Sequence, residues 1–523
     1  MLSSPDVRQV IFEDAACLCG EPREFGKECD KQKGTIGEPA NDRQATVFSM
    51  YQRILTACHT IDFDDQIILA NKILTEHPDV REHWQSKAKH LLVDEYQDIN
   101  RPQLDLIRLL SEGNRSGLFV VGDDDQSIYG FRGAQPDFIR DFTKDFGPEA
   151  RFEAIPDCWR CQPHVIFGAH GFIETFNPGR LNKPLPDCNR PEGPLIDVHN
   201  VPSDSREAEI LVRIIEDALN HGEVLVLVPK LEHAEPIKAA LSKNGIPYQV
   251  QTPRSTDSVR VFSALKIWLA NPEDNFVFRE LLQFVADSKV LGIPGPGVKL
   301  PDTVAAREVA LSKLSHLWTE VLDNNKSLRQ SLGDQTENDP FYENLNGIVL
   351  GLAGSIDGSA SDFAEGTLDA LRPWKSGKQM LKELAAAALS PQDKQTGGAR
   401  AARIMTMRYS KGLEADTVIV LGLEEGAFPT YQPGTAEFEE QARLFYVSMT
   451  RAKESLHLFH ARKRSGRATF AARSHNLKPS PFIGGLPKEH RKVTYHQSAA
   501  QRAKKRELMA TSGSEGRRNG SPL

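Results

Sequence analysis

The sequence predicts an α/β protein in which parallel sheets form two lobes with mostly helical insertions. Between residues 91 and 121, two short apolar runs flank one amphipathic segment, which is the pattern of a parallel βαβ unit. Four more apolar runs of strand length follow between residues 224 and 459, with helical patterns among them. The 523 residues suffice for two to four domains, and 39% hydrophobic with 26% charged residues is ordinary for a globular protein.

The first 90 residues are expected to be loop and then helix. Residues 1 to about 45 are polar and partly Gly-rich, which favours loop with room for one helix. Apolar residues at helical spacing then predict helices near residues 48–55 and 67–74.

The βαβ unit begins with an apolar strand over residues 91–93. Pro102 suits the first turn of the following helix, whose apolar residues recur at helical spacing. A second strand over residues 118–121 completes the unit, so that strand, helix and strand fall within residues 91–121.

The second lobe is expected to be interrupted. A strand over residues 224–228 leads into a helix near 234–243, which Asn244-Gly245 should end. Residues 272–395 combine Gly/Pro turns with helical patterns and predict a mostly helical insertion. The sheet should then resume with strands over 404–407, 417–421 and 456–459 and a helix over 438–452.

Charge is distributed unevenly along the chain. The net charge is -7, yet residues 462–523 hold 15 Lys+Arg against 3 Asp+Glu, which gives that segment +12 and leaves -19 for the rest. A basic end punctuated by Ser and Gly either binds a polyanion or is a solvated, flexible tail, and composition leaves both open.

Composition excludes several classes of protein. No apolar run approaches the roughly 18–20 residues that span a bilayer, and the N-terminus lacks the pattern of a signal peptide. We therefore expect a soluble cytoplasmic protein with no membrane partner. Seven cysteines exclude a disulfide-dense secreted scaffold, and the Cys158/Cys161 pair has no second pair beside it in the sequence, so zinc is not expected there.

Two acidic clusters follow the strands of the βαβ unit, at the sheet edge where parallel sheets bind ligands. Asp94 directly after a strand suits Mg²⁺, and Glu95 can orient and deprotonate an attacking water, although a bare Asp-Glu pair is more often a solvated turn. The second cluster, residues 122–126, packs so many carboxylates that a cation or polar ligand is expected, and Gln126 can contact a γ-phosphate or its attacking water.

An aromatic segment follows the second cluster. Tyr129, Phe131 and the cation Arg132 lie among glycines in a segment with the pattern of a loop. This combination suits stacking on unpaired bases, whereas two isolated aromatics are more often part of a core.

Here the sequence resembles a known family, the UvrD/Rep-type superfamily 1 helicases. Residues 91–98 (LLVDEYQD) and 120–134 (VVGDDDQSIYGFRGA) look like motifs II and III, and residues 61–65 look like the segment ahead of motif II. Residues 158–160, 405–429 and 440–456 stand where the family has motifs IV, V and VI.

The resemblance implies roles for individual residues, with ATP and Mg²⁺ as cofactors. Asp94 would serve Mg²⁺, Glu95 would be the catalytic base and Gln126 would sense the γ-phosphate. Arg160 and Arg451 would stabilise the transferred phosphoryl group, and Glu414 would bind the ribose. On the DNA side, Tyr129 and Phe131 would stack on bases beside Arg132, and Thr406 and Arg408 would contact the DNA backbone. A planar guanidinium suits the phosphoryl role better than Lys does.

Some positions depart from the family pattern. Arg408 stands where the family usually has His, Cys158 replaces Asn and Trp159 replaces Tyr. No GxxxxGK[ST] motif, whose backbone N–H groups and Lys cradle phosphates, occurs: neither Gly26-Lys27 nor Gly377-Lys378 fits. We therefore expect the chain to begin inside the accessory domain of the first lobe and to turn over little ATP alone.

Two explanations of the missing motif stay open. Either that part is encoded elsewhere, for example in a separate chain, or the start of the sequence is assigned too late. Alternatively, the protein is a degenerate member that binds DNA or a partner without hydrolysing ATP. We expect two RecA-like lobes, of which the first is incomplete. The expected domains are a helical accessory remnant over 1–60, the partial first lobe over 61–155, the second lobe over 156–271 and 396–461, the insertion over 272–395 and the tail over 462–523.

The expected function is ATP-dependent 3′–5′ unwinding or translocation on DNA in repair or recombination, at single strands and single-strand/duplex junctions. The alternative is an ATPase-deficient single-strand DNA-binding or regulatory subunit. An ATPase acting on protein or small molecules is less favoured, because the Tyr129/Phe131 pair and the motif V resemblance both indicate nucleic acid.

Overall fold

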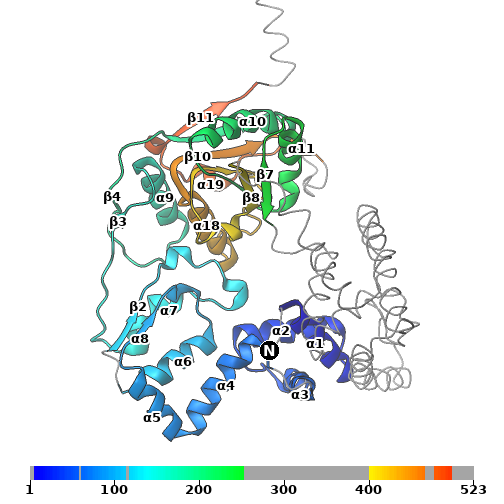
Figure 1. The fold of residues 1–523 in the computed structure, drawn as a ribbon, viewed down its shortest axis with the longest axis vertical. Helices are drawn as coiled ribbons and strands as arrows, with labels where there is room; N and C mark the ends of the chain where they lie inside the picture. The colour runs from blue at the N-terminus through cyan, green and yellow to red at the C-terminus, as the bar shows by residue number, and fades with distance from the viewer. Residues whose placement is uncertain (1–4, 58–60, 114–116, 252–399, 466–475, 498–523) are drawn as a thin grey trace, which may run out of the picture.

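The computed structural model describes residues 5–57, 61–113, 117–251, 400–465 and 476–497. These residues form helices and parallel sheets, which confirms the predicted α/β class. Two bodies are visible in Figure 1: a first lobe around a two-stranded sheet and a second lobe around a seven-stranded sheet. The predicted helical insertion over 272–395 lies outside the described residues.

The N-terminal segment is helical, so the prediction of loop over residues 1 to about 45 was wrong. It forms α1 (Pro5–Leu18), α2 (Arg23–Thr35) and α3 (Asp42–Ala57). In α2, buried Lys33 places its Nζ 2.7 Å from Asp62 Oδ2 and 2.5 Å from Asp65 Oδ1. Because this helix packs partly through a buried ionic cluster, an apolar periodicity does not reveal it.

The first lobe follows the predicted order closely. Its sheet pairs β1 with β2 in parallel, with Leu92 opposite Phe119. The core of the lobe includes Tyr96 and Leu104 and is covered by helices, whereas Leu92 and Phe119 point outward and are exposed. The elements are α4 (Phe63–Glu76), α5 (Pro78–Lys87), β1 (Leu91–Val93), α6 (Arg101–Ser111), β2 (Leu118–Val120), α7 (Asp137–Arg140) and α8 (Phe142–Phe146).

The second lobe is a seven-stranded parallel sheet in the order β11-β5-β10-β9-β6-β8-β7. The predicted strands at 224–228, 404–407, 417–421 and 456–459 are confirmed, with small shifts at their ends. The strands are β5 (Ile196–Val201), β6 (Val224–Val228), β7 (Tyr248–Gln251), β8 (Ala402–Thr406), β9 (Ala415–Val420), β10 (Ala452–Ala461) and β11 (Arg491–Tyr495).

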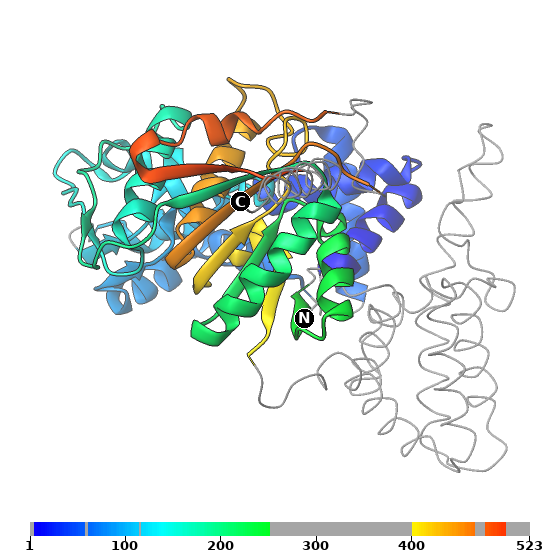
Figure 2. The same cartoon turned by 90° about the horizontal axis from the view of Figure 1, so that it is seen from above.

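Helices cover both faces of this sheet (Figure 2). One core cluster joins β6 side chains Leu225 and Leu227 to α9 and α18, and another joins Val224, Val226 and Val228 to α10 and α11. A strand buried on both faces explains the continuous apolar run in the sequence. The helices are α9 (Pro163–Phe176), α10 (Asp204–His221), α11 (Glu235–Lys243), α18 (Ala436–Met449) and α19 (Pro481–Gly484).

The end of the chain corrects the predicted tail. Residues 462–523 were expected to be flexible, yet β11 lies within this segment and pairs with β5 as an edge strand. Phe482 of α19 is fully buried in the core of the second lobe. A basic composition hides these elements, because an edge strand needs few apolar side chains.

Short elements complete the fold. Two two-residue strands, β3 (Asp157–Cys158) and β4 (Asp187–Cys188), pair in parallel beside the second lobe. The 3₁₀ turns are η1 (Tyr96–Asp98), η3 (Asp124–Gln126), η4 (Gly130–Arg132), η5 (Leu231–Ala234), η6 (Met407–Ser410) and η8 (Lys488–His490). Among the described residues, no helix has both the length and the apolarity to cross a bilayer.

Candidate nucleotide and DNA site

Two carboxylates stand at the carboxyl end of β1. Asp94 and Glu95 follow the strand directly, and both are exposed. Glu95 has φ +52°, and its N–H donates to Asp94 Oδ1 at 2.8 Å. In the described part of the chain it is the one non-glycine residue with positive φ. Strain of this kind, roughly 1–3 kcal/mol, persists where the surroundings enforce it and clusters at functional sites.

A buried glutamine joins the turn after β1 to the turn after β2. Gln97 Nε2 donates to the Glu95 carboxylate, and Gln97 Oε1 accepts from the Asp123 N–H at 2.9 Å. Gln126 Nε2 in turn donates to Asp123 Oδ2 at 2.7 Å. The predicted base Glu95 and the predicted γ-phosphate sensor Gln126 are therefore held by one hydrogen-bonded pair of turns.

The carboxylates of the second acidic cluster are neutralised by the protein's own cations. Arg180 Nη2 and Lys183 Nζ each lie 2.7 Å from Asp125 Oδ2, and Arg140 Nε lies 2.9 Å from Asp124 Oδ2. Burial opposes ionisation of Asp125, but hydrogen bonds and charge from Arg180 and Lys183 outweigh it and lower the pKa of its carboxyl. The sequence predicted a cation or polar ligand here, and these side chains supply it.

Three consecutive backbone carbonyls of the first lobe, residues 126–128, each accept a hydrogen bond from a cation of the second lobe. Lys411 Nζ donates to the first at 2.9 Å, Arg443 Nε to the second at 2.7 Å, and Arg408 to the third. Ile128 itself is fully buried in the core of the second lobe. This 126–128 carbonyl run begins at the predicted γ-phosphate sensor Gln126 and ends one residue before the predicted base-stacking residue Tyr129.

Lys411 also reaches the turn after β1. Its nearly buried ammonium forms an ion pair with Asp98 and lies 3.4 Å from Glu95 Oε2. The same nitrogen lies 5.2 Å from the centre of the Tyr129 ring, within the range of a cation–π contact. No role for Lys411 was predicted from the sequence, although the residue lies inside the segment that resembles motif V.

The predicted phosphoryl and ribose residues meet on the second lobe. Arg160 Nε lies 2.9 Å from Glu414 Oε2, and Lys453 Nζ lies 3.0 Å from Glu414 Oε1. Hydrogen bonds from Lys453 and then Arg160 lower the pKa of the Glu414 carboxyl. Arg451 is buried and donates to main-chain oxygens, including that of Leu413 at 3.2 Å, and burial lowers its pKa to about 10.

The predicted base-stacking residues form one surface at η4. The rings of Tyr129 and Phe131 meet edge to face with centres 6.0 Å apart, and Phe131 is half exposed. Arg132 lies 5.5 Å and Arg408 lies 4.8 Å from the centre of the Phe131 ring. Thr406, the last residue of β8, precedes Arg408 by two residues at the same sheet edge. Four of the five predicted DNA residues, Tyr129, Phe131, Arg132 and Arg408, therefore lie in contact around the Phe131 ring.

A glutamate on α18 completes this surface and was missed by the sequence analysis. Glu440 Oε1 accepts from Arg408 Nη2 at 2.6 Å. A Cβ added at Gly130 would lie 2.3 Å from Glu440 Oε2, so a larger residue there would require the Glu440 carboxylate to shift. Glu440 therefore holds Arg408 against η4 and packs closely against Gly130.

Three cysteines lie next to the predicted phosphoryl-binding Arg160. Cys158 and Cys188 stand opposite each other in β3 and β4, and both Sγ atoms contact the Cys161 carbonyl, at 4.0 and 3.2 Å. A hydrogen bond with the Cys161 thiol lowers the pKa of Cys158 to about 6. Sequence spacing showed the Cys158/Cys161 pair but could not show Cys188 beside it.

Comparison with known proteins matches this arrangement to one family. Residues 21–147 match the UvrD/REP helicase N-terminal domain, and residues 359–463 match the UvrD-like helicase C-terminal domain. The chain is 26% identical over 498 residues to DNA helicase II of Escherichia coli strain K12, covering 87% of this chain and 66% of that protein.

Two further relatives give the same result. The chain is 27% identical over 518 residues to the ATP-dependent DNA helicase PcrA of Staphylococcus aureus strain MRSA252, covering 89% of this chain and 68% of that protein. It is 27% identical over 500 residues to DNA helicase II of Haemophilus influenzae, covering 86% and 66%. The chain thus spans about two thirds of the length of these relatives. With both domains and the ordered motifs in place, it belongs to the UvrD/Rep-type superfamily 1 DNA helicases.

Proposed function

We propose that this protein couples ATP hydrolysis to 3′–5′ movement along single-stranded DNA and unwinds single-strand/duplex junctions in repair or recombination. The observation that supports this most is the 126–128 carbonyl run. It begins at the predicted phosphate sensor Gln126 and ends next to the predicted base-stacking Tyr129, and each carbonyl is held by a cation of the other lobe.

The nucleotide would lie where the turns after β1 and β2 face the second lobe. Asp94 and Glu95 present exposed carboxylate oxygens, which are the ligands that Mg²⁺ prefers, so the residues fit the ion. Bound Mg²⁺ would neutralise charge on the phosphates of ATP. Glu95 would take a proton from the attacking water, and Gln126 would orient that water.

The arginines would act from the second lobe. Arg160 is partly exposed and can move from Glu414 toward a phosphate, since its ion pair is solvated and weak. Arg451 is buried against main-chain oxygens, so its contribution requires that the loop at Leu413 move. The proposal therefore assigns the first phosphate contact to Arg160.

The DNA strand would cross η4. Unpaired bases would stack on Phe131 and Tyr129, while Arg132, Arg408 and Thr406 would contact the backbone. Arg408 also donates to the Ile128 carbonyl of the 126–128 carbonyl run. A shift of the DNA strand at Arg408 would therefore change the position of Gln126, two residues before Ile128.

Phosphate release with and without single-stranded DNA tests this function. We expect little release by this chain alone, DNA-stimulated release once a segment carrying GxxxxGK[ST] is supplied fused or in trans, and loss of that release in Glu95→Gln. Glu112→Gln, which changes an exposed carboxylate at the end of α6, should leave it unchanged. Arrival of the protein at labelled 5′ or 3′ ends of the strand measures direction. Release that is insensitive to DNA or to Glu95→Gln contradicts the proposal.

The second candidate is a single-strand DNA-binding or regulatory protein without turnover. The sequence favours it in one respect, because no GxxxxGK[ST] motif is present to cradle the phosphates. Tight single-strand binding with no phosphate release at saturating ATP and Mg²⁺, even when a segment carrying GxxxxGK[ST] is supplied, is the result that selects this candidate over the first.

A further inference from the structure

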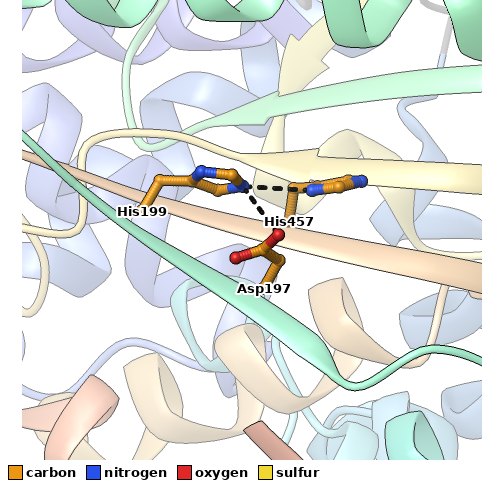
Figure 3. Close-up of side chains that lie close together, drawn as sticks. All are labelled: Asp197, His199 and His457. Atoms are coloured by element: carbon orange, nitrogen blue, oxygen red, sulfur yellow. Dashed lines mark hydrogen bonds and ion pairs between the residues drawn. The ribbon is translucent and has the colours of Figure 1, made fainter. Parts of the chain in front are cut away.

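A separate cluster of histidines lies on the second-lobe sheet and uses none of the residues discussed for nucleotide or DNA. In the register of β5 and β10, His457 stands opposite Asp197 and Phe459 opposite His199. Residues two apart on a strand share a face, so Asp197, His199 and His457 project to the same side of the sheet. Figure 3 shows the three side chains pointing toward one another.

Their distances are those of ligands around one small cation. His199 Nε2 lies 3.2 Å from His457 Nδ1 and 3.6 Å from Asp197 Oδ2, and all three ligand atoms lie within 4.8 Å of one another. Tetrahedral zinc has bonds of about 2.0–2.1 Å to His nitrogen, which places neighbouring ligand atoms roughly 3.3–3.4 Å apart. The cluster therefore needs only small side-chain shifts to surround an ion.

We propose that Asp197, His199 and His457 form a zinc site on the second lobe. Two imidazoles and one carboxylate are a common zinc ligand set, and three protein ligands leave the fourth position open. His457 also lines a cavity of about 560 Å³ beneath α10, together with Arg213 and Asp416. The fourth ligand is then a water molecule or an anionic group that enters from this cavity.

Neighbouring groups hold two of the ligands in place. His496 Nε2 lies 3.0 Å from His199 Nδ1, so the second nitrogen of His199 is already engaged while Nε2 faces the cluster. The ring of Phe459 stacks on His199 with centres 4.2 Å apart. Thr494 Oγ1 donates to Asp197 Oδ1 at 3.0 Å, which leaves Oδ2 directed at the histidines. Such outer contacts orient metal ligands and strengthen binding.

One cation competes with zinc for the carboxylate. Lys492 Nζ lies 3.0 Å from Asp197 Oδ2, the oxygen that faces His199. The Lys492 side chain is half exposed at the sheet edge and can turn into solvent when the ion binds. Removal of this charge should therefore tighten zinc binding, an effect that a histidine cluster without an ion site does not predict.

Zinc titration of the metal-stripped full chain by calorimetry, with metal content after dialysis, tests the site. We expect one zinc per chain, loss of binding in His199→Ala and in His457→Ala, weakening of about 10–100-fold in His496→Ala, and tighter binding in Lys492→Gln. The matched control is His221→Ala, which removes an exposed histidine of the same cavity from outside the ligand set. Asp197→Asn keeps the side-chain volume while it removes the carboxylate ligand. It replaces the alanine variants as the test of the ligand set if one of them fails to fold.

Substitution of cobalt for zinc identifies the ligand atoms. We expect the visible d–d absorption of a four-coordinate ion with nitrogen and oxygen ligands, lost in Asp197→Asn. A near-ultraviolet thiolate-to-cobalt band would place the ion on cysteines and overturn the proposal. Absence of stoichiometric binding, or binding that ignores the ligand substitutions, would overturn it equally.

Discussion

Replacing Lys411 by Met should weaken the connection between the two lobes without removing side-chain volume. The Met side chain keeps the apolar stem that packs beside Tyr129, but it cannot donate to the Gln126 carbonyl or pair with Asp98. The nearly buried Asp98 carboxylate then loses its partner. This variant isolates the charge from the packing.

The magnitude follows from burial of the pair. The side chains of Lys411 and Asp98 are 8% and 17% exposed. Breaking a fully buried ion pair costs about 3–5 kcal/mol, and residual solvent contact at Asp98 reduces our expectation to about 2–3 kcal/mol of the free energy of unfolding. Lys144→Met removes a solvated pair with Asp141 and should leave the free energy of unfolding nearly unchanged.

Equilibrium urea unfolding of Lys411→Met, Asp98→Asn and the double variant measures the coupling. We expect the double variant to be less destabilised than the sum of the singles, with a coupling energy above about 1 kcal/mol. A coupling energy below about 0.5 kcal/mol would refute the reasoning, because the pair would then contribute no more than a solvated one.

The loss should also depend on pH. Burial raises the pKa of Asp98 above 3.8, and the hydrogen bond from Lys411 works against that rise. Without Lys411 the pKa rises further, so the folded state binds more protons than the unfolded state above pH 3.8. Stability is then lost as the pH rises through the folded pKa. We expect the difference from the wild type to be small near pH 4 and to grow toward pH 7.

Three other predictions follow from the structure. Alanine at both Tyr129 and Phe131 should weaken single-strand binding by about 1–3 kcal/mol per ring in fluorescence anisotropy, and equal weakening on duplex would contradict base stacking. Iodoacetamide should alkylate Cys158 with a midpoint near pH 6, because thiolate is the reactive form, and Cys161→Ala should move that midpoint toward 9.0. Deleting residues 498–523 removes six Lys+Arg, so the log–log salt slope of single-strand binding should fall by up to about 4, while an unchanged slope would mean that these charges do not touch DNA.

Much of the fold could be predicted because its strands are buried on both faces. The run over Val224–Val228 has no polar residue and therefore identifies itself as a central strand. Where packing depends on charge, the sequence is misleading. Lys33 is buried and β11 is part of a sheet, yet the hydrophobic pattern of the sequence predicts solvent-exposed residues at both places.

The sequence predicts which residues of the candidate site carry suitable chemical groups better than it predicts which residues contact one another. Asp94, Glu95 and Gln126 follow strands, and the ends of parallel strands can be located from the sequence. The cations that neutralise Asp125 come from residues 180 and 183, more than fifty positions away, and no local pattern connects them. Lys411 could have been noticed within its motif, but its four partners, Glu95, Asp98, the Gln126 carbonyl and the Tyr129 ring, are known only from the folded chain.

The 126–128 carbonyl run connects the predicted nucleotide site with the predicted DNA site in our proposal. Arg160 and Arg451 contact Glu414 and Leu413 within the second lobe, so those contacts survive a movement between lobes. The bonds to carbonyls 126–128 join the lobes, and a relative movement must break or replace them. Gln126 lies at one end of this run, and Tyr129 follows directly after the other end. Only three peptide units therefore separate them, and closure of the lobes around a nucleotide at Gln126 would also move the stacking surface at Tyr129.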